Sequence, residues 1–233
     1  QSQIKIALGL DLSVDDLAEV KKSQDEKKEY SANNLIPAQR ILNVSAEIYE
    51  VENFLSADEC KKLIDEIKSE LRPSTIATDG EFDSTYRTSS TCDLGNKNNP
   101  FLQKIDKRIS DFIVIDTCYG ETLQGQHYLE KQEFKAHTDY FEGSQLMEHD
   151  GGRGQRTYTF MIYLNEVKQG GETEFTRLNK IFSPTPGKAL IWNNLNEDGT
   201  PNENTMHQAH PVIKGEKTII TKWFRQKALS QGR

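Results

Sequence analysis

The stretch Phe134-Lys135-Ala136-His137-Thr138-Asp139-Tyr140 decides the architecture and the chemistry of this chain, because it sets a histidine and a carboxylate two positions apart. Residues i and i+2 of a β-strand project from the same face. His137 and Asp139 would therefore direct an imidazole nitrogen and a carboxylate oxygen at one point, which suits a divalent metal ion. A His-x-Asp triplet also occurs by chance in chains that bind no metal, so the prediction depends on the rest of the sequence.

Composition limits the class of protein. The chain has 233 residues, of which 35% are hydrophobic and 28% charged, and this is typical of one globular domain with a well-solvated surface. No stretch approaches the roughly 20 consecutive apolar residues of a membrane span. The formal net charge of −7 argues against nucleic acid as a partner, since phosphate binding requires a basic face.

Three cysteines, Cys60, Cys92 and Cys118, share no C-x-x-C spacing. We expect small thiols in or near the core rather than a disulfide framework. This favours a reducing compartment, and we expect a cytoplasmic location.

The first part of the chain is helical in pattern. Residues 1–40 are predicted to form an N-terminal helical arm, with a surface helix from Ser13 to about Tyr30, and residues 41–233 form the main domain. Ser56 and Glu59 have capping-box spacing, which predicts a helix over 57–71. Pro100 opens a second helix, and the polar stretch 77–99 between the two helices is predicted to be a long loop.

From about residue 123 the pattern changes to short strands separated by turns rich in Gly and Pro. The predicted strands are 123–129, 134–139, 157–165, 172–176, 188–193, 206–213 and 217–225. Helices followed by many short strands predict an α+β fold with a double-stranded β-helix (jelly-roll) core and helices packed on one outer face.

A third metal ligand must come from the four other histidines. His127 is predicted to be a hydrogen-bonded structural residue, and His149 lies in a polar turn where it is solvated. His207 and His210 lie on one strand but face opposite sides, so at most one of them can join the pair in the opening stretch. The residues alone leave this choice open. Two histidines and one carboxylate are the ligand set of non-haem Fe(II) oxygenases.

Lys217 lies ten positions beyond His207, across a Lys214-Gly215 turn. A hairpin there would bring Lys217 beside His207 and point it inward. A buried lysine needs an anionic partner, and a dicarboxylate that bridges metal and ammonium would supply one. The alternative is a solvated lysine at a strand edge, as we expect for Lys214 and Lys222.

An ordered series of motifs over about residues 47–226 resembles the catalytic domain of prolyl 4-hydroxylases, with microbial members the better fit. The motifs are Val51-x-Asn53-Phe54-Leu55-Ser56-x-x-Glu59-Cys60, Arg87-Thr88-Ser89-Ser90, Tyr128…Phe134-x-x-His137-x-Asp139, Arg156-Thr157-Tyr158-Thr159-Phe160-Met161-Ile162-Tyr163-Leu164-Asn165-x-Val167, Gly170-Gly171-Glu172-Thr173-x-Phe175, Pro184-Thr185-Pro186-Gly187-Lys188-Ala189-Leu190-Ile191-Trp192 and Thr205-x-His207-x-x-x-Pro211-Val212-x-x-Gly215-x-Lys217-x-x-x-x-x-Trp223.

The resemblance implies hydroxylation of peptidyl proline at C4 with O2 and 2-oxoglutarate, releasing succinate and CO2, with ascorbate as an auxiliary reductant. It implies that Fe(II) is held by His137, Asp139 and His207, and that Lys217 binds the distal carboxylate of 2-oxoglutarate. By the same resemblance, the cosubstrate pocket is lined by Tyr128, Thr159 and Tyr163, and a proline-containing peptide is bound by Arg156, Trp223, Tyr140 and Arg87.

Two positions depart from the family pattern. Arg225 stands where collagen-type members have a histidine, and His210 stands where a cysteine or small residue is usual, as an outer-shell group or a rival ligand. Three other functions stay open: a 2-oxoglutarate oxygenase acting on another residue or a small molecule, a zinc hydrolase with the same ligands, and a non-catalytic peptide-binding β-roll. The oligomeric state is not predicted.

Overall fold

The computed structural model describes residues 36, 38–41, 44–75, 85–95, 98–149 and 151–229. The helix expected between Ser13 and Tyr30 lies outside this part of the chain. Strand β1 (Gln39–Arg40) pairs with β2 (Ile48–Val51), so the sheet begins within the stretch that we assigned to the arm. Within the described residues, no helix combines the length and apolar character needed to cross a membrane.

The larger sheet has eight antiparallel strands in the order β1-β2-β11-β7-β14-β5-β4-β3. Its remaining members are β11 (Ala189–Asn193), β7 (Arg156–Tyr163), β14 (Lys217–Arg225), β5 (Gln124–Tyr128), β4 (Ser90–Asp93) and β3 (Arg72–Pro73).

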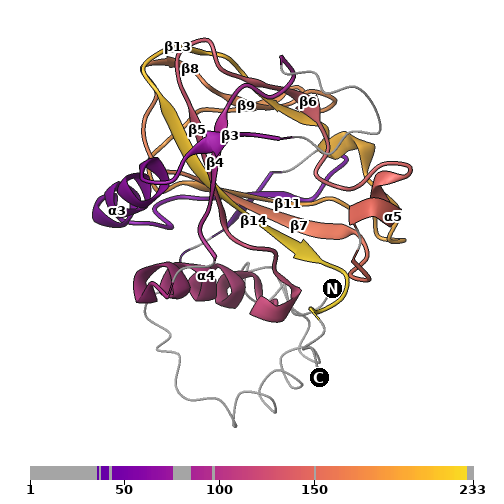
Figure 1. Ribbon diagram of the computed structural model, residues 1–233. Coiled ribbons are helices and arrows are strands. Elements are labelled where there is room, and N and C mark those ends of the chain that lie inside the picture. Colours follow the sequence, from indigo (N-terminus) through magenta and orange to yellow (C-terminus); the bar gives the residue numbers. More distant parts are fainter. Residues whose placement is uncertain are drawn as a thin grey trace.

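The smaller sheet has the order β10-β9-β12-β6, and a separate pair joins β13 to β8. These strands are β10 (Lys180–Phe182), β9 (Thr173–Phe175), β12 (His207–Ala209), β6 (Phe134–His137), β13 (Val212–Lys214) and β8 (Gln169–Gly170). In Figure 1, β6 and β9 lie above the large sheet, and helices α3 and α4 lie on its other side. The predicted jelly-roll core with helices on one outer face is confirmed.

The helices begin where the sequence predicts. The capping box closes at the start of α3 (Ala57–Lys68): the Ser56 backbone N–H donates to the Glu59 carboxylate at 3.0 Å, and the Glu59 N–H donates to the Ser56 hydroxyl at 3.2 Å. Asn99 caps α4 (Pro100–Ile113), with Pro100 in its first turn. The shorter helices are α5 (Gln145–His149), η1 (Thr117–Tyr119) and η2 (Glu203–Thr205).

Alternation along the strands builds two separate cores, one on each face of the large sheet. On β7, Phe160 and Ile162 pack toward the helices, whereas Met161 and Tyr163 pack toward the smaller sheet. The residues between the sheets include Tyr128, Trp192, Phe175 and others of both sheets. The candidate site lies in this inner layer.

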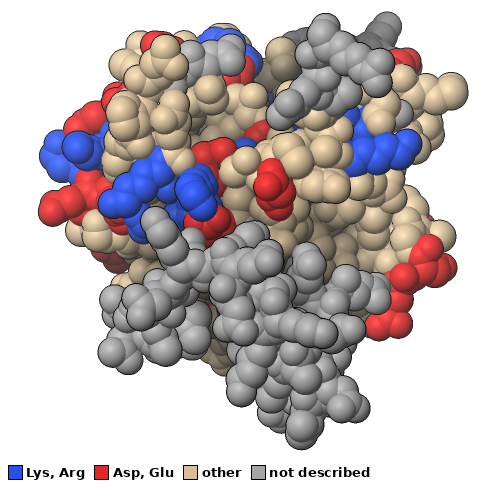
Figure 2. Space-filling model, turned by 90° about the horizontal axis from the view of Figure 1, so that it is seen from below, with Lys and Arg blue, Asp and Glu red and all other residues tan. Residues whose placement is uncertain are grey.

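The helical side of the molecule is drawn in Figure 2, where basic and acidic side chains of the described residues lie intermixed. Ion pairs join residues one turn apart within the helices: Lys61 Nζ lies 2.9 Å from Asp65 Oδ2 in α3, and Lys107 Nζ lies 2.7 Å from Asp111 Oδ1 in α4. Such exposed pairs contribute about 0.3–0.5 kcal/mol each.

Three local predictions are wrong. The stretch 77–99 is not all loop, because β4 lies within it and pairs with β5. The stretch 206–213 is not one strand but the two strands β12 and β13, and neither of them pairs with β14, so no hairpin sets Lys217 beside His207. Lys222 is not solvated: it is 3% exposed, and its ammonium lies 2.6 Å from the carboxylate of Asp106 on α4.

Candidate active site

Two strands of the smaller sheet and the turn after one of them bring three ligand atoms together. His137 ends β6, His207 begins β12, and these two residues are paired in register. Nε2 of His137 lies 4.0 Å from Oδ1 of Asp139, and Nε2 of His207 lies 4.0 Å from Oδ2 of the same carboxylate. All three ligand atoms lie within 4.8 Å of one another, and no other such cluster of His, Cys, Asp or Glu occurs among the described residues.

Backbone carbonyls fix the tautomer of both imidazoles. Nδ1 of His137 lies 2.8 Å from the Lys135 carbonyl, and Nδ1 of His207 lies 2.9 Å from the Thr205 carbonyl. A carbonyl oxygen can only accept, so Nδ1 carries the proton and Nε2 presents its lone pair toward Asp139. Burial, together with the neighbouring His207, lowers the pKa of His137 to about 3, which keeps this imidazole neutral at physiological pH.

Aromatic rings hold the histidines in place. Phe134 stacks on His137 with ring centroids 3.5 Å apart and an interplanar angle of 12°, and the Trp192 ring centroid lies 4.9 Å from that of His207.

Burial raises the pKa of Asp139, but the adjacent His207 and His137 outweigh burial and hold this pKa below its usual value. Two imidazole nitrogens and a carboxylate are a donor set that fits Fe(II).

Lys217, the first residue of β14, opens on the same cavity. Its side chain is 1% exposed, and its ammonium is buried with no hydrogen-bond partner. Nζ lies 5.3 Å from the ring centroid of Tyr128 and 5.6 Å from that of Tyr163. Burial lowers the pKa of Lys217 from 10.5 to about 7, although Glu172 opposes the change. A buried amine without a partner fits the carboxylate of a small anionic ligand.

The cavity is lined by one face of β14 and by inward-facing residues of neighbouring strands. Lys217, Ile219, Thr221 and Trp223 follow the two-residue period of a strand and all line it. The other lining residues are Arg87, Gln126, Tyr128, Phe134, His137, Asp139, Met161, Thr173, Trp192, His207 and Ala209. Sequence reasoning missed Gln126, Thr173 and Thr221; counting in twos from Lys217 would have found Thr221.

The three residues predicted for the cosubstrate pocket are placed differently. Tyr128 lines the cavity. Tyr163 presents its ring to Lys217, while its hydroxyl donates to Thr173 Oγ1 at 2.7 Å. Thr159 lies outside the lining residues, and its hydroxyl donates to Oδ2 of Asp139 at 2.8 Å.

Of the four residues predicted to bind peptide, Arg87 and Trp223 line the cavity. Arg156 forms a bidentate ion pair with Glu121, with N–O distances of 2.8 and 2.7 Å. Its guanidinium lies 4.2 Å from the Trp223 ring centroid. Tyr140 is buried, 7% exposed, and lies outside the lining.

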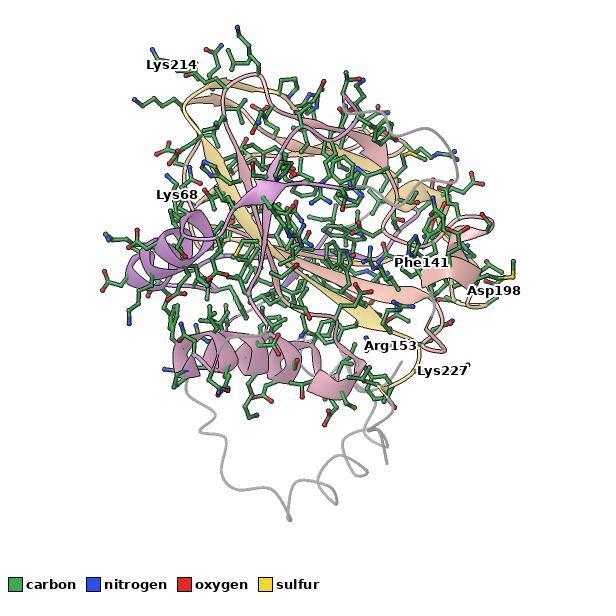
Figure 3. All side chains as sticks on the ribbon, viewed as in Figure 1. Lys68, Phe141, Arg153, Asp198, Lys214 and Lys227 are labelled. Atoms are coloured by element: carbon green, nitrogen blue, oxygen red, sulfur yellow. The ribbon has the colours of Figure 1, made fainter. Side chains whose placement is uncertain are left out.

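Arg225 also pairs with Glu121, at 3.1 Å, so that two arginines share one carboxylate. Both guanidinium groups lie against the ring of Phe141, at 5.0 Å for Arg156 and 4.8 Å for Arg225. Figure 3 labels Phe141 beside α5. Arg225, which departs from the family pattern, therefore belongs to a packed cluster with Arg156, Glu121 and Phe141.

The remaining histidines lie away from the ligand cluster. His210 points to Glu174, with Nε2 2.7 Å from the carboxylate oxygen, so it is not a rival ligand. His127 is buried and lies 3.0 Å from the Thr218 hydroxyl, and His149 is exposed at the end of α5, as the sequence predicts for both.

Comparisons with known proteins agree with this geometry. Residues 123–225 match the family described as the 2OG-Fe(II) oxygenase superfamily. Prolyl 4-hydroxylase 5 of Arabidopsis thaliana is 36% identical over 194 residues, which cover 74% of this chain and 66% of that protein. Prolyl 4-hydroxylase 1 of the same plant is 33% identical over 208 residues, which cover 82% of this chain and 72% of that protein.

A solved structure with the same fold is the viral collagen prolyl hydroxylase of Paramecium bursaria Chlorella virus-1 in its 2OG complex. It is 25% identical with a TM-score of 0.61, and the match covers 76% of this chain and 95% of the viral chain. The chain therefore belongs to the prolyl 4-hydroxylase family of the 2OG-Fe(II) oxygenase superfamily, whose members are dioxygenases that use Fe(II), 2-oxoglutarate and O2.

Proposed function

We propose that this chain hydroxylates proline residues of a peptide or protein at C4, using O2 and 2-oxoglutarate and releasing succinate and CO2. One observation carries the proposal: a two-histidine, one-carboxylate cluster and a buried, unpartnered lysine open on one cavity. The relatives named prolyl 4-hydroxylases support proline as the substrate residue.

His137, Asp139 and His207 would hold the Fe(II) ion through Nε2, a carboxylate oxygen and Nε2. When bound, the iron with 2-oxoglutarate and O2 supplies an oxidant strong enough for an unactivated C–H bond. The carbonyls of Lys135 and Thr205 hold Nδ1 of the two imidazoles, so that each ring directs Nε2 toward the metal position.

Lys217 would bind the distal carboxylate of 2-oxoglutarate. The ammonium has no hydrogen-bond partner within the protein, so the cosubstrate would supply one. The rings of Tyr128 and Tyr163 cover the ammonium and exclude water from it. Ascorbate, as a reductant that returns oxidised iron to Fe(II), belongs to the proposal through the resemblance to the family.

Arg87 and Trp223 would contact the peptide at the cavity. Arg156 holds the Trp223 indole in place, and Tyr140 directly follows the ligand Asp139 in the sequence. An extended proline-containing segment in polyproline II form suits recognition by aromatic and arginine side chains.

A zinc hydrolase with the same ligands is disfavoured by the cavity lining. Such an enzyme needs a second carboxylate or an equivalent base beside the metal-bound water. Among the residues that line the cavity, Asp139 is the only carboxylate, and it belongs to the ligand cluster.

The test is turnover with Fe(II), 2-oxoglutarate and a proline-rich peptide, compared with the same peptide carrying alanine at every proline. We expect succinate and a hydroxylated product with the first peptide and only background succinate with the second. Equal succinate with both peptides and no modified proline would show that proline is not the substrate residue of this oxygenase. Hydrolysis with zinc and no turnover with iron would contradict the oxygenase itself.

A further inference from the structure

A chain of three hydrogen bonds leads from the large sheet to the candidate metal ligand Asp139. Trp192 Nε1 donates to Asn194 Oδ1 at 2.9 Å, Asn194 Nδ2 donates to Thr159 Oγ1 at 2.9 Å, and Thr159 Oγ1 donates to Asp139 Oδ2 at 2.8 Å. Thr159 and Asn194 are 0% exposed, and Trp192 is 1% exposed. We call Trp192, Asn194 and Thr159 the relay.

The direction of every bond in the relay is determined by its first member. An indole nitrogen can only donate, so Asn194 must turn its carbonyl oxygen toward Trp192. Its amide NH2 then faces Thr159, whose oxygen accepts. The single hydroxyl proton of Thr159 is therefore left for the carboxylate of Asp139, as an ionised acceptor requires.

Backbone pairing fixes the relay in place. Trp192 and Thr159 are register partners on β11 and β7. The Asn194 backbone N–H donates to the Thr157 carbonyl at 2.7 Å, and its carbonyl accepts from the Asn202 N–H at 2.9 Å. Asp139, in contrast, lies just beyond β6 of the smaller sheet, so the relay ties a ligand on one sheet to a rigid anchor on the other.

The relay also bears on a second ligand, since the Trp192 ring packs edge-on against His207. Trp192 thus limits the rotation of the His207 imidazole through the contact of the two rings. It also limits the orientation of the Asp139 carboxylate through the hydrogen bonds that begin at the indole N–H. The resemblance implies that Thr159 lines the cosubstrate pocket, and in the structure its hydroxyl donates to Asp139.

We propose that Thr159, Asn194 and Trp192 are positioning residues that make Asp139 a one-oxygen ligand. The Thr159 hydroxyl donates to Oδ2, which lies 4.0 Å from Nε2 of His207, and we assign the metal to Oδ1, which lies 4.0 Å from Nε2 of His137. A carboxylate free to use both oxygens would take one more coordination position, and that position is needed for the cosubstrate or O2. This inference rests on the proposed function, because it concerns the same metal site.

The test uses Mn(II) as a redox-stable probe of the apoprotein, with affinity measured by calorimetry and metal-bound water counted by water-proton relaxation. Thr159→Val removes the hydroxyl at nearly constant shape. We expect its Mn(II) affinity to fall by about 10–100-fold, the range for loss of an outer-shell partner, and the bound ion to hold one water fewer than in the wild type. Thr159→Ser keeps the hydroxyl and should restore the wild-type water count and an affinity within about 3-fold of wild type.

Thr157→Val is the matched control, since Thr157 lies two residues earlier on β7 and its hydroxyl donates to the Phe224 carbonyl at 3.1 Å, away from Asp139. It should leave Mn(II) affinity and water count unchanged. If Thr159→Val proves unstable by circular dichroism, Thr159→Ala replaces it with the same expected result. Wild-type affinity and water count in these variants would overturn the inference and leave the proposed function standing, whereas a wild-type protein that binds no Mn(II) would count against both.

Discussion

Replacing Lys217 by methionine should stabilise the protein in the absence of 2-oxoglutarate. Lys217 is 1% exposed and its ammonium has no hydrogen-bond partner, so the folded state either buries a charge or loses a proton. Burial lowers its pKa from 10.5 to about 7. At about 1.4 kcal/mol per pKa unit, this change corresponds to roughly 5 kcal/mol of unfavourable free energy. Methionine has similar length and no charge, and it removes this cost.

The gain should depend on pH in a defined direction. Because the folded pKa lies below the unfolded one, the cost is complete below a pH of about 7, shrinks as the pH rises from about 7 toward 10.5, and is absent above that. The wild-type protein should therefore gain stability over this alkaline range relative to Lys217→Met. Saturating 2-oxoglutarate should stabilise the wild type at neutral pH and leave the variant unchanged, since a ligand stabilises the state that binds it.

Urea denaturation at about pH 6.5 and about pH 9.5, with and without 2-oxoglutarate, measures all of these quantities. Lys214→Met is the control, because Lys214 is exposed at the end of β13, where Figure 3 labels it, and its replacement should change stability by no more than about 0.5 kcal/mol. The reasoning is refuted if Lys217→Met is less stable than the wild type at about pH 6.5 without 2-oxoglutarate. That result would mean that the ammonium already has a partner in the empty cavity.

Three other substitutions test separate parts of the structure. His137→Ala removes a ligand, and turnover should fall by more than the roughly 10–100-fold typical of losing an outer-shell partner, with an unchanged circular dichroism spectrum; turnover near wild type would exclude His137 as a ligand. Glu121→Gln leaves the guanidinium groups of Arg156 and Arg225 without their shared carboxylate, and urea denaturation should show a loss of about 3–5 kcal/mol; a loss below about 1 kcal/mol would show that solvent already screens this cluster. Val114→Gly should raise stability by about 1 kcal/mol, because this β-branched residue caps α4 with a φ of 56°, where glycine is favoured; a lower melting temperature would contradict the strain.

The sequence predicted well wherever a local pattern determines the structure. The capping box at Ser56, the proline that opens α4 and the two-residue period of β14 each specify an element without help from distant residues. The pair His137 and Asp139 follows from spacing alone, and the ligand cluster needed only one more histidine. The choice between His207 and His210 could not be made from the residues, because it depends on which face of the smaller sheet turns toward the cavity, and His210 lies beyond the end of β12.

Two of the wrong predictions share a physical cause, which is that tertiary contacts changed the environment of polar residues. Strand β4 has the polar sequence Ser-Thr-Cys-Asp and forms because β5 and β3 pair with its two edges. Lys222 was expected in solvent, but α4 crosses its strand and supplies Asp106, and Gly120 leaves room for the long side chain: a Cβ there would lie 2.6 Å from Nζ. The helical arm before residue 39 and the cytoplasmic location stay predictions.

The proposed reaction requires that one cavity hold iron, a dicarboxylate and a proline within reacting distance. Turnover of a proline-rich peptide under O2 enriched in the heavy oxygen isotope, followed by mass spectrometry of both products, shows whether the two oxygen atoms are divided between peptide and cosubstrate. We expect one labelled oxygen atom in 4-hydroxyproline of the peptide and the other in succinate. Succinate that carries label while the peptide prolines stay unmodified, or hydroxyproline whose oxygen comes from unlabelled water, would contradict it.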